Sequence, residues 1–580
     1  MVEPSQSILE QRHDQIYASL DPPEVERVRR FGNLRSFAVG ESLWTVGQVA
    51  PGLMVILAGK VAVTERDQFD NHKPILVLGR GNFLGELAVL SGRPALVDAT
   101  AQEPVDALII PSERLRALMV AEAELGERIM RALILRRMAI LEGKVGGPII
   151  LGHAENGDVL RLQGFLDRNA HPHQLLNPET DAPAKVLIER FHIDPGQLPI
   201  VLCPGGQLLR NPTVDQLARC LGLVGPIDPD RLYDVAVIGA GPAGLATAVY
   251  AASEGLSVVV LDCRSFGGQA GASARIENYL GFPTGITGMA LMARAYNQAQ
   301  KFGAEIAIPD EATSFDAAGS QGHFTLNLRI GERVNARSVV LATGARYRRL
   351  DVENLDAFEA SSVHYWASPR EAKLCADQEV VLVGAGNSAG QAAVYLASQS
   401  AKVWMLVRRS ELAATMSRYL VDRIHGLDNV EVVTKATISQ LEGHDGMLEA
   451  VRWKIAGGQE ARRPINHLFL FIGAEPNTDW LQGSGIGLDA KGFILTGEDA
   501  AGDRHALETT QRGVFAIGDV RSKSVKRVAA AVGEGAQVVA ALHAYLAGSQ
   551  VSPPPAEMKR PNHDEARRPV ERKLAQPPMS

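Results

Sequence analysis

The sequence VAVIGAGPAGLATAVYAAS at residues 235–253 returns as VVLVGAGNSAGQAAVYLAS at residues 380–398. Each copy has an apolar run of strand character, a glycine-rich turn and a small-residue segment that can form a helix. The repeat predicts two dinucleotide-binding α/β folds, and therefore either two bound dinucleotides or one fold that has lost its ligand. The 580 residues leave room for further domains, because domains typically span about 100–200 residues.

The first copy carries a complete glycine fingerprint behind a strand. Its first glycine permits a tight turn, its second lets backbone approach a pyrophosphate, and its third lets the helix pack closely on the strand. The next apolar strand ends at Asp262, an acid that can accept hydrogen bonds from a ribose hydroxyl. The predicted binding residues are Gly239, Ala240, Gly241, Pro242, Ala243, Gly244 and Asp262.

The second copy departs from the first where its strand ends. Val407 stands in the place of Asp262, and Arg408 and Arg409 follow it. Guanidinium groups in place of an acid favour a ribose 2′-phosphate, so the second copy predicts NADPH. The alternative, two surface arginines at a strand end, stays open. The predicted residues are Gly384, Gly386, Asn387, Ser388, Ala389 (in place of the third glycine), Arg408 and Arg409.

From Tyr233 to Leu546 the sequence resembles the thioredoxin reductase family of flavoproteins. It carries, in that family's order, Gly267-Gly268-Gln269, Ile276-Glu277-Asn278-Tyr279, Ala342-Thr343-Gly344 and Gly518-Asp519. The resemblance implies that the first fold, residues 229–347 and 473–547, holds FAD. It also implies that an NADPH-binding domain, residues 348–472, is inserted into that fold, and that the protein is a homodimer. The further FAD-binding residues that it implies are Gly268, Gln269, Asn278, Thr343, Gly344, Gly518, Asp519, Lys526, Arg527, Val528 and Ala529.

The redox Cys-x-x-Cys of that family has no counterpart in this chain. In the matching stretch, residues 363–369, Trp366 and Pro369 occupy the places of the two cysteines. Disulfide exchange needs a thiolate nucleophile and a resolving thiol, and neither residue can serve. We therefore expect electrons to pass from NADPH through FAD to an unidentified acceptor, such as a small redox protein, without an internal dithiol. No side chain is assigned as catalytic.

Residues 20–140 resemble the cyclic nucleotide-binding domain, a β-roll followed by a helix. FLGELA at residues 83–88 and SGRP at residues 91–94 follow its phosphate-binding cassette, and Glu86 stands where that family binds the ribose. Ala95 replaces the arginine that binds the cyclic phosphate, and Arg93 lies on the other side of Pro94. A buried phosphate without a cation loses its hydration uncompensated. We therefore favour a degenerate sensor over a functional nucleotide site, with the second reading kept open.

Residues 149–224 resemble a thioredoxin- or glutaredoxin-like fold. Leu198-Pro199-Ile200-Val201 matches the strand that begins with the cis-proline of that fold, but GHAEN at residues 152–156 has no redox cysteine. We expect Cys203 to be a small buried residue and the segment to serve in docking or packing. The whole prediction is a multidomain chain with a β-roll, a thioredoxin-like α/β domain and two Rossmann-like domains of the thioredoxin reductase type. Residues 548–580 are expected to be a disordered tail.

The amino-acid composition and net charge exclude several classes of protein. The hydrophobic fraction of 46% and the charged fraction of 22% are those of an ordinary globular protein, and the net charge of −7 argues against a general nucleic-acid binder. Residues 1–20 lack the apolar run of a signal peptide, and 235–253 fit a strand–turn–helix better than a membrane span. We expect a cytoplasmic protein. The cysteines are too few and scattered for a disulfide framework or a zinc site, and no metal is expected: Cys203, Cys220, Cys263 and Cys375.

Two functions from different classes are consistent with these patterns. The first is an FAD-dependent NADPH oxidoreductase, with a ferredoxin- or flavodoxin-NADP reductase as the alternative enzyme. The second is a regulatory sensor, loaded with flavin or nucleotide, whose N-terminal modules bind partners. Rapid bleaching of the flavin by NADPH would distinguish the enzyme from the sensor.

Overall fold

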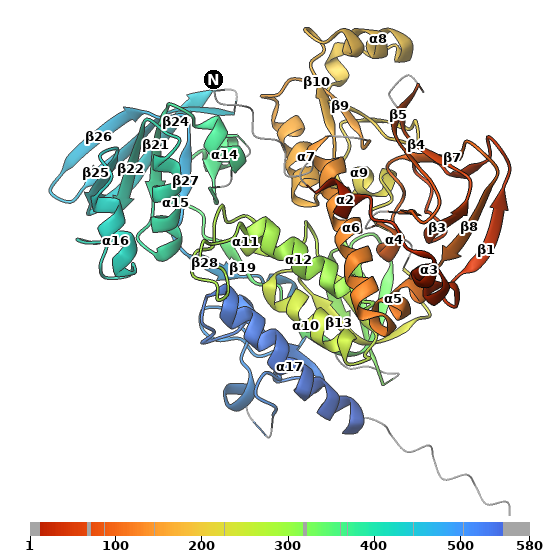
Figure 1. Ribbon diagram of the computed structural model, residues 1–580. Helices are drawn as coiled ribbons and strands as arrows, with labels where there is room; N and C mark the ends of the chain where they lie inside the picture. Colours follow the sequence, from red (N-terminus) through yellow and green to blue (C-terminus); the bar gives the residue numbers. More distant parts are fainter. Residues whose placement is uncertain are drawn as a thin grey trace, which may run out of the picture.

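The computed structural model describes residues 12–66, 71–85, 88–143, 146–224, 227–316, 322–359, 361–367, 369–444, 446–500, 502 and 504–548. Glu86 of the predicted cassette and residues 549–580 of the predicted tail lie outside this range. Figure 1 shows three bodies, with the first fingerprint domain (green and blue) between the N-terminal domains and the second fingerprint domain.

The N-terminal domain is a β-roll of two four-stranded sheets, in the strand orders β1-β8-β3-β6 and β2-β7-β4-β5. Their strands are β1 (Asn33–Phe37), β2 (Ser42–Trp44), β3 (Leu53–Ala58), β4 (Val61–Arg66), β5 (His72–Leu78), β6 (Phe83–Leu84), β7 (Asp98–Ala101) and β8 (Val105–Ile110). The helices are α2 (His13–Ile16), α3 (Pro22–Arg29), α4 (Ala88–Ser91), α5 (Ser112–Ala121) and α6 (Ala123–Glu142).

The helical pattern that follows the roll forms two helices instead of one. Glu122 separates α5 from α6, because its backbone leaves the helical region at φ −122° and ψ 71°. Its carboxylate bonds the guanidinium groups of Arg27 and Arg30, with Arg30 Nη2 at 2.7 Å. Apolar periodicity continues across the break, so the sequence pattern alone could not reveal it.

Residues 149–224 form a four-stranded sheet in the order β10-β9-β11-β12. Strands β9 and β10 are parallel, β11 runs antiparallel to β9, and the Leu198–Pro199 peptide before β11 is cis. The elements are β9 (Ile149–Leu151), α7 (Gly157–Arg168), β10 (Gln174–Leu176), α8 (Ala182–Phe191), η1 (Pro195–Gln197), β11 (Ile200–Leu202), β12 (Leu208–Arg210) and α9 (Val214–Cys220). The resemblance of this segment to a thioredoxin-like fold stays a prediction.

The structure contains one disulfide that the sequence pattern, which predicts no disulfide framework, does not reveal. Cys203 and Cys220 form a disulfide, with Cα atoms 6.3 Å apart and a sequence separation of 17. Cys203 follows β11 and lies in the core between α9 and the sheet, and Cys220 ends α9 and packs against that core partly buried. Tertiary packing of a helix on a strand brought them together, which spacing in the sequence does not show.

The first fingerprint domain is a seven-stranded sheet in the order β15-β14-β13-β18-β17-β16, with β29 beside β18. Helices α10, α12 and α17 lie together against it (Figure 1). The strands are β13 (Leu232–Ile238), β14 (Val258–Leu261), β15 (Glu305–Ala307), β16 (Ala312–Asp316), β17 (Phe324–Leu328), β18 (Arg333–Leu341) and β29 (Val514–Ala516). The helices are α10 (Pro242–Ser253), α11 (Gly268–Gly271), α12 (Gly288–Lys301), η2 (Asp479–Leu481), η3 (Gly497–Ala500), η4 (Gly518–Val520) and α17 (Val528–Gly548).

The second fingerprint domain has a five-stranded parallel sheet, β20-β27-β21-β22-β23, and a three-stranded meander, β24-β25-β26. A short ribbon, β19 (Ala345–Tyr347) paired with β28 (Ala474–Pro476), joins it to the first domain. Its strands are β20 (Val363–His364), β21 (Glu379–Val383), β22 (Lys402–Val407), β23 (Val430–Thr434), β24 (Ala436–His444), β25 (Met447–Ile455), β26 (Gln459–Pro464) and β27 (Leu468–Leu470). Its helices are α13 (Leu355–Phe358), α14 (Pro369–Leu374), α15 (Asn387–Ala397) and α16 (Arg418–His425).

Residues 235–253 form strand β13, a glycine turn and helix α10, as the sequence predicts. Among the described residues, no helix is long and apolar enough to cross a membrane.

Candidate dinucleotide sites and the cleft between them

The three glycines of the first fingerprint have different spatial requirements. A Cβ on Gly239 would overlap the carbonyl of Ala342, and one on Gly244 would overlap the carbonyl of Gly239. A Cβ on Gly241 would meet no atom within 4 Å. The outer two glycines are therefore required by packing, whereas the space over Gly241 is open for a ligand. Because Gly241 also caps the N-terminus of α10, this open space suits a pyrophosphate.

The carboxylate of Asp262 lies beside this turn. Its Oδ2 accepts a hydrogen bond from Ala240 N at 2.9 Å, and its Oδ1 accepts from Arg264 N at 2.9 Å and Ser265 N at 3.2 Å. Burial raises its pKa, and these backbone donors act in the opposite direction. Carboxylate oxygens have further lone pairs, so Asp262 can still accept from a ribose hydroxyl. The open space at Gly241 and the carboxylate of Asp262 therefore fit the adenosine half of FAD.

Three further predicted segments meet the first fingerprint. A Cβ added to Gly268 would lie 3.2 Å from the Cα of Gly241. A Cβ added to Gly518 would lie 3.0 Å from the Cβ of Ala243. The side chain of Gln269 donates to the carbonyl of Ala345. Thr343 and Gly344, directly after β18, bond the backbone and side chain of Asn477.

The remaining predicted flavin residues lie in two places. Burial raises the pKa of Asp519, whose carbonyl accepts from Lys526 Nζ at 2.5 Å. Arg527, Val528 and Ala529 follow at the start of α17. Asn278 is exposed, and among the described residues its side chain has no hydrogen bond to the fingerprint segments. The carboxylate of Glu534, on α17, accepts a hydrogen bond from Gly518 N at 2.6 Å.

The second fingerprint repeats the geometry of the first. A Cβ on Gly384 would approach the carbonyl of Phe471, whereas one on Gly386 would meet nothing within 4 Å. Ala389 is fully buried, so its methyl group fits where the first copy has glycine. Asn387 Oδ1 accepts from Ser417 N at 2.7 Å and fixes the start of α15. The open space at Gly386 and the N-terminus of α15 again fit a pyrophosphate.

Arg408 and Arg409 follow strand β22 and are exposed. Within the described part of the chain, neither guanidinium has a hydrogen bond or an ion pair. Both groups therefore remain available to a phosphate at the end of this strand.

A cleft of about 330 Å³ lies between the two fingerprint domains. It is lined from the first domain by Gln269 and Tyr347, and from the second by Trp366, Ser388 and Phe471, among others. Residues of both predicted cofactor sites therefore share one space. Such a cleft can bring two cofactors together.

Trp366, which the sequence predicts to stand in the place of a redox cysteine, forms part of this cleft. The guanidinium of Arg168, at the end of α7, lies over its ring with Cζ 4.2 Å from the centroid. Tyr365 stacks on Tyr347 with centroids 6.0 Å apart. None of the described residues that line the cleft is a cysteine.

The two free cysteines are poor candidates for a thiolate. Cys375 is buried behind α14, and burial raises its pKa to about 12. Desolvation and the neighbouring Asp262 raise the pKa of Cys263 to about 11. Both thiols remain protonated at neutral pH, and a protonated thiol is a weak nucleophile.

Residues 233–535 match the pyridine nucleotide-disulphide oxidoreductase family. The chain belongs to this family. Thioredoxin reductase of Peptoclostridium acidaminophilum is 32% identical over 326 residues, which are 55% of this chain and 98% of that protein. NADPH-dependent thioredoxin reductase 3 of Arabidopsis thaliana is 30% identical over 385 residues, 63% of this chain and 69% of that protein. The crystal structure of T. acidophilum thioredoxin reductase superposes with a TM-score of 0.50 at 28% identity, over 55% of this chain and 99% of that one.

This flavoprotein is thus an FAD-dependent NAD(P)H oxidoreductase related to thioredoxin reductases, and FAD and NADPH are the cofactors of that family. Residues 34–122 match the cyclic nucleotide-binding domain, which confirms the predicted nature of the β-roll.

Ala95, which the sequence predicts to replace the phosphate-binding arginine, is a residue of the core of the roll. Ala95 is 8% exposed and packs in the apolar core of the roll with Trp44 and Leu84. The buried carboxylate of Asp98 lies nearby on β7 and is bonded by Arg66 Nε at 3.1 Å. Glu86 lies outside the described residues.

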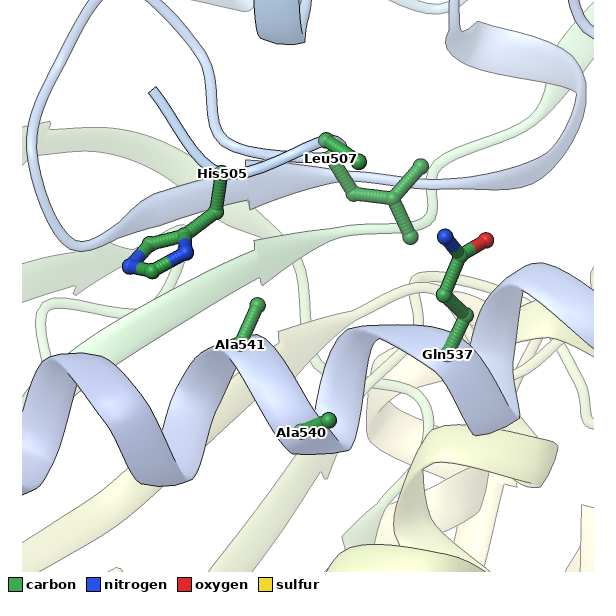
Figure 2. A pocket seen from close by; sticks show the side chains of 6 residues that line it. His505, Leu507, Gln537, Ala540 and Ala541 are labelled. Atoms are coloured by element: carbon green, nitrogen blue, oxygen red, sulfur yellow. The ribbon is translucent and has the colours of Figure 1, made fainter. Parts of the chain in front are cut away.

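Figure 2 shows a second hollow, of about 280 Å³, between the loop that carries His505 and Leu507 and helix α17. Gln537, Ala540 and Ala541 line its other side. None of its lining residues belongs to either predicted dinucleotide site.

Proposed function

We propose that this flavoprotein transfers reducing equivalents from NADPH to FAD and then to an external acceptor, without a cysteine pair beside the flavin. The proposal rests on the residues that line the cleft between the two fingerprint domains. Trp366 lies there, and in the part of the chain that the structure describes no residue that lines the cleft is a cysteine. The sequence also contains no Cys-x-x-Cys.

The chain's own residues supply binding and positioning. Gly241 and Gly386 allow two pyrophosphates to approach backbone at two helix N-termini. Asp262 suits a ribose hydroxyl, whereas Arg408 and Arg409 suit a 2′-phosphate. FAD supplies the hydride chemistry when it is bound, so a general acid or base is not needed for the first half-reaction.

The acceptor is proposed to be a small redox protein, with ferredoxin- or flavodoxin-NADP reductase activity as the alternative. The relatives named thioredoxin reductase favour a redox protein as partner. A homodimer in the cytoplasm remains part of this proposal.

A regulatory role is the second candidate, and one contact favours it. Helix α4 of the cassette packs against α12 of the FAD-binding domain. The N-terminal domain therefore touches the flavoenzyme directly and is positioned to influence it.

The test is anaerobic mixing of the FAD-loaded protein with NADPH, followed by a screen of quinones, ferredoxin, flavodoxin, disulfides and oxygen. The proposal predicts rapid bleaching by NADPH and turnover with at least one acceptor after Cys263 and Cys375 are both changed to serine. A flavin that NADPH does not bleach would favour the sensor. Flavin reduction without turnover in the Cys263→Ser/Cys375→Ser variant alone would place a cysteine on the electron path.

A further inference from the structure

Two consecutive arginines on helix α6 reach in different directions. Arg136 is 8% exposed and points into the N-terminal domain, where its Nη1 donates to Phe83 O at 2.8 Å and Gly85 O at 3.0 Å. Its Nε donates to Ile16 O at 2.9 Å. Arg137 points the other way, and its Nη2 donates to Ala170 O at 2.9 Å.

Arg136 fixes the first residues of the cassette. Among the described residues it has no carboxylate partner, and burial lowers its pKa to about 10. Its ring neighbour is Phe83, with Cζ 4.6 Å from the centroid. A buried guanidinium held by carbonyl oxygens is costly to displace, so the cassette backbone and α6 are expected to move as one body.

Ala170 lies at the end of α7, where the chain turns with φ +49° and packs against the core of the FAD-binding domain. Its neighbour Asn169 is 4% exposed. Asn169 Nδ2 donates to Phe165 O at 3.0 Å, within α7, and to Arg264 O at 3.1 Å, in the FAD-binding domain. Both amide hydrogens are therefore used, one on each side of a domain boundary.

Arg264 belongs to the loop that holds the predicted ribose acid. Its N–H donates to Asp262 Oδ1 at 2.9 Å, and Asp262 Oδ2 accepts from Ala240 N in the glycine fingerprint. Hydrogen bonds thus follow one another from the cassette to the first dinucleotide site. The contacts of Arg136, Arg137 and Asn169 with Phe83, Ala170 and Arg264 join segments that are distant in sequence.

We propose that Arg137 and Asn169 are positioning residues that couple the cassette of the cyclic nucleotide-binding domain to the ribose loop of the FAD site. Arg137 holds the end of α7 to α6, and Asn169 holds the Asp262 loop to the end of α7. A change that moves the cassette therefore alters FAD affinity, and FAD binding in turn stabilises the cassette, since coupling between sites is reciprocal. The proposal concerns FAD binding and does not depend on the electron acceptor.

The first test measures the Kd of FAD for the full-length apoprotein by quenching of flavin fluorescence. Arg137→Ala and Asn169→Ala should each raise the Kd about two- to tenfold, the range expected for one lost hydrogen bond. Arg137→Lys keeps a donor and should recover most of the affinity. Arg131→Ala is the matched control, because Arg131 is an exposed residue of α6 whose ion pair is with Glu127 on the same helix.

The double variant Arg137→Ala/Asn169→Ala should raise the Kd by less than the product of the two single effects, because both residues act through the same contact series. An unchanged Kd in Arg137→Ala, or an equal rise in Arg131→Ala, would overturn the proposal. If Asn169→Ala does not fold, the Kd values of Arg137→Ala and Arg137→Lys still decide whether the proposal holds.

The second test reads the coupling in the opposite direction. Amide hydrogen exchange of residues 83–85 and 88–91 should slow when FAD binds to the wild-type protein, and this protection should shrink in Arg137→Ala. Equal exchange with and without FAD in the wild-type protein would show that the cassette and the flavin site are independent.

Discussion

The guanidinium of Arg93 lies over the ring of Tyr296, with Cζ 5.5 Å from the ring centroid. Arg93 belongs to the cassette and Tyr296 to α12, so the contact joins the N-terminal domain to the FAD-binding domain. Tyr296 in turn packs on Phe266, with centroids 4.6 Å apart, directly before Gly267-Gly268-Gln269. Arg93, two residues before Ala95 in the sequence, is thus engaged in an interdomain contact.

Cyclic AMP is expected not to bind at micromolar concentration. Ala95 supplies no charge, and Arg93 is held against Tyr296, so a phosphate in the roll would lose its hydration without compensation. Isothermal titration calorimetry checks this directly. Micromolar binding would contradict it, and Ala95→Arg should create binding if the rest of the pocket is intact.

Changing both Arg408 and Arg409 to alanine should raise the KM for NADPH about tenfold or more and leave that for NADH nearly unchanged. Each charge-assisted hydrogen bond to a phosphate contributes about 1.5–3 kcal/mol, and about 1.4 kcal/mol corresponds to a factor of ten. Steady-state kinetics with the two coenzymes makes the comparison. Equal losses for both would refute the 2′-phosphate assignment.

Gly241→Val should yield a folded protein without FAD. A side chain at this position meets no protein atom within 4 Å, but it fills the space needed by the pyrophosphate. The flavin absorbance of the purified variant and its circular dichroism give the answer. Gly244→Val is the contrast, because its side chain would overlap the carbonyl of Gly239 and should impair folding itself. Full flavin content in Gly241→Val would refute the first site.

Asp310→Asn should stabilise the protein at pH 7–8 and not near pH 4. Burial, Glu332 and Asp215 raise the pKa of Asp310, and Arg219 acts in the opposite direction. The net result is a pKa of about 6. A carboxyl whose pKa is raised in the fold favours folding when protonated, so its stabilising effect is complete below about pH 4 and is lost as the pH rises through 6. The expected gain at neutral pH is about 1–3 kcal/mol, from urea unfolding curves. A gain that is independent of pH would contradict the assignment.

The dinucleotide folds could be predicted from sequence because their signal is local. A strand, a glycine turn and a helix occupy about twenty consecutive residues, and the structure has them as β13–α10 and β21–α15. The strand-end acid Asp262 could be identified for the same reason, because it ends the next strand.

Features that depend on tertiary packing could not be predicted. The Cys203–Cys220 disulfide forms because α9 packs on the sheet, and the break at Glu122 interrupts no apolar pattern. Arg137 and Asn169 look like ordinary residues of two helices, and their contacts with Ala170 and Arg264 depend on how the domains pack together. The sequence gives a weak indication of the role of Arg136, because a charged residue at an otherwise apolar position of α6 must find polar partners when it is buried.

The number of electrons that the protein accepts per flavin tests the absence of an internal dithiol most directly. In an anaerobic titration, the account predicts that FAD is fully bleached by one molecule of NADPH, because no disulfide exchanges electrons with the flavin. Consumption of a second molecule of NADPH per FAD would contradict it. Loss of that second equivalent in Cys203→Ser/Cys220→Ser would then identify their disulfide as the centre that takes the electrons.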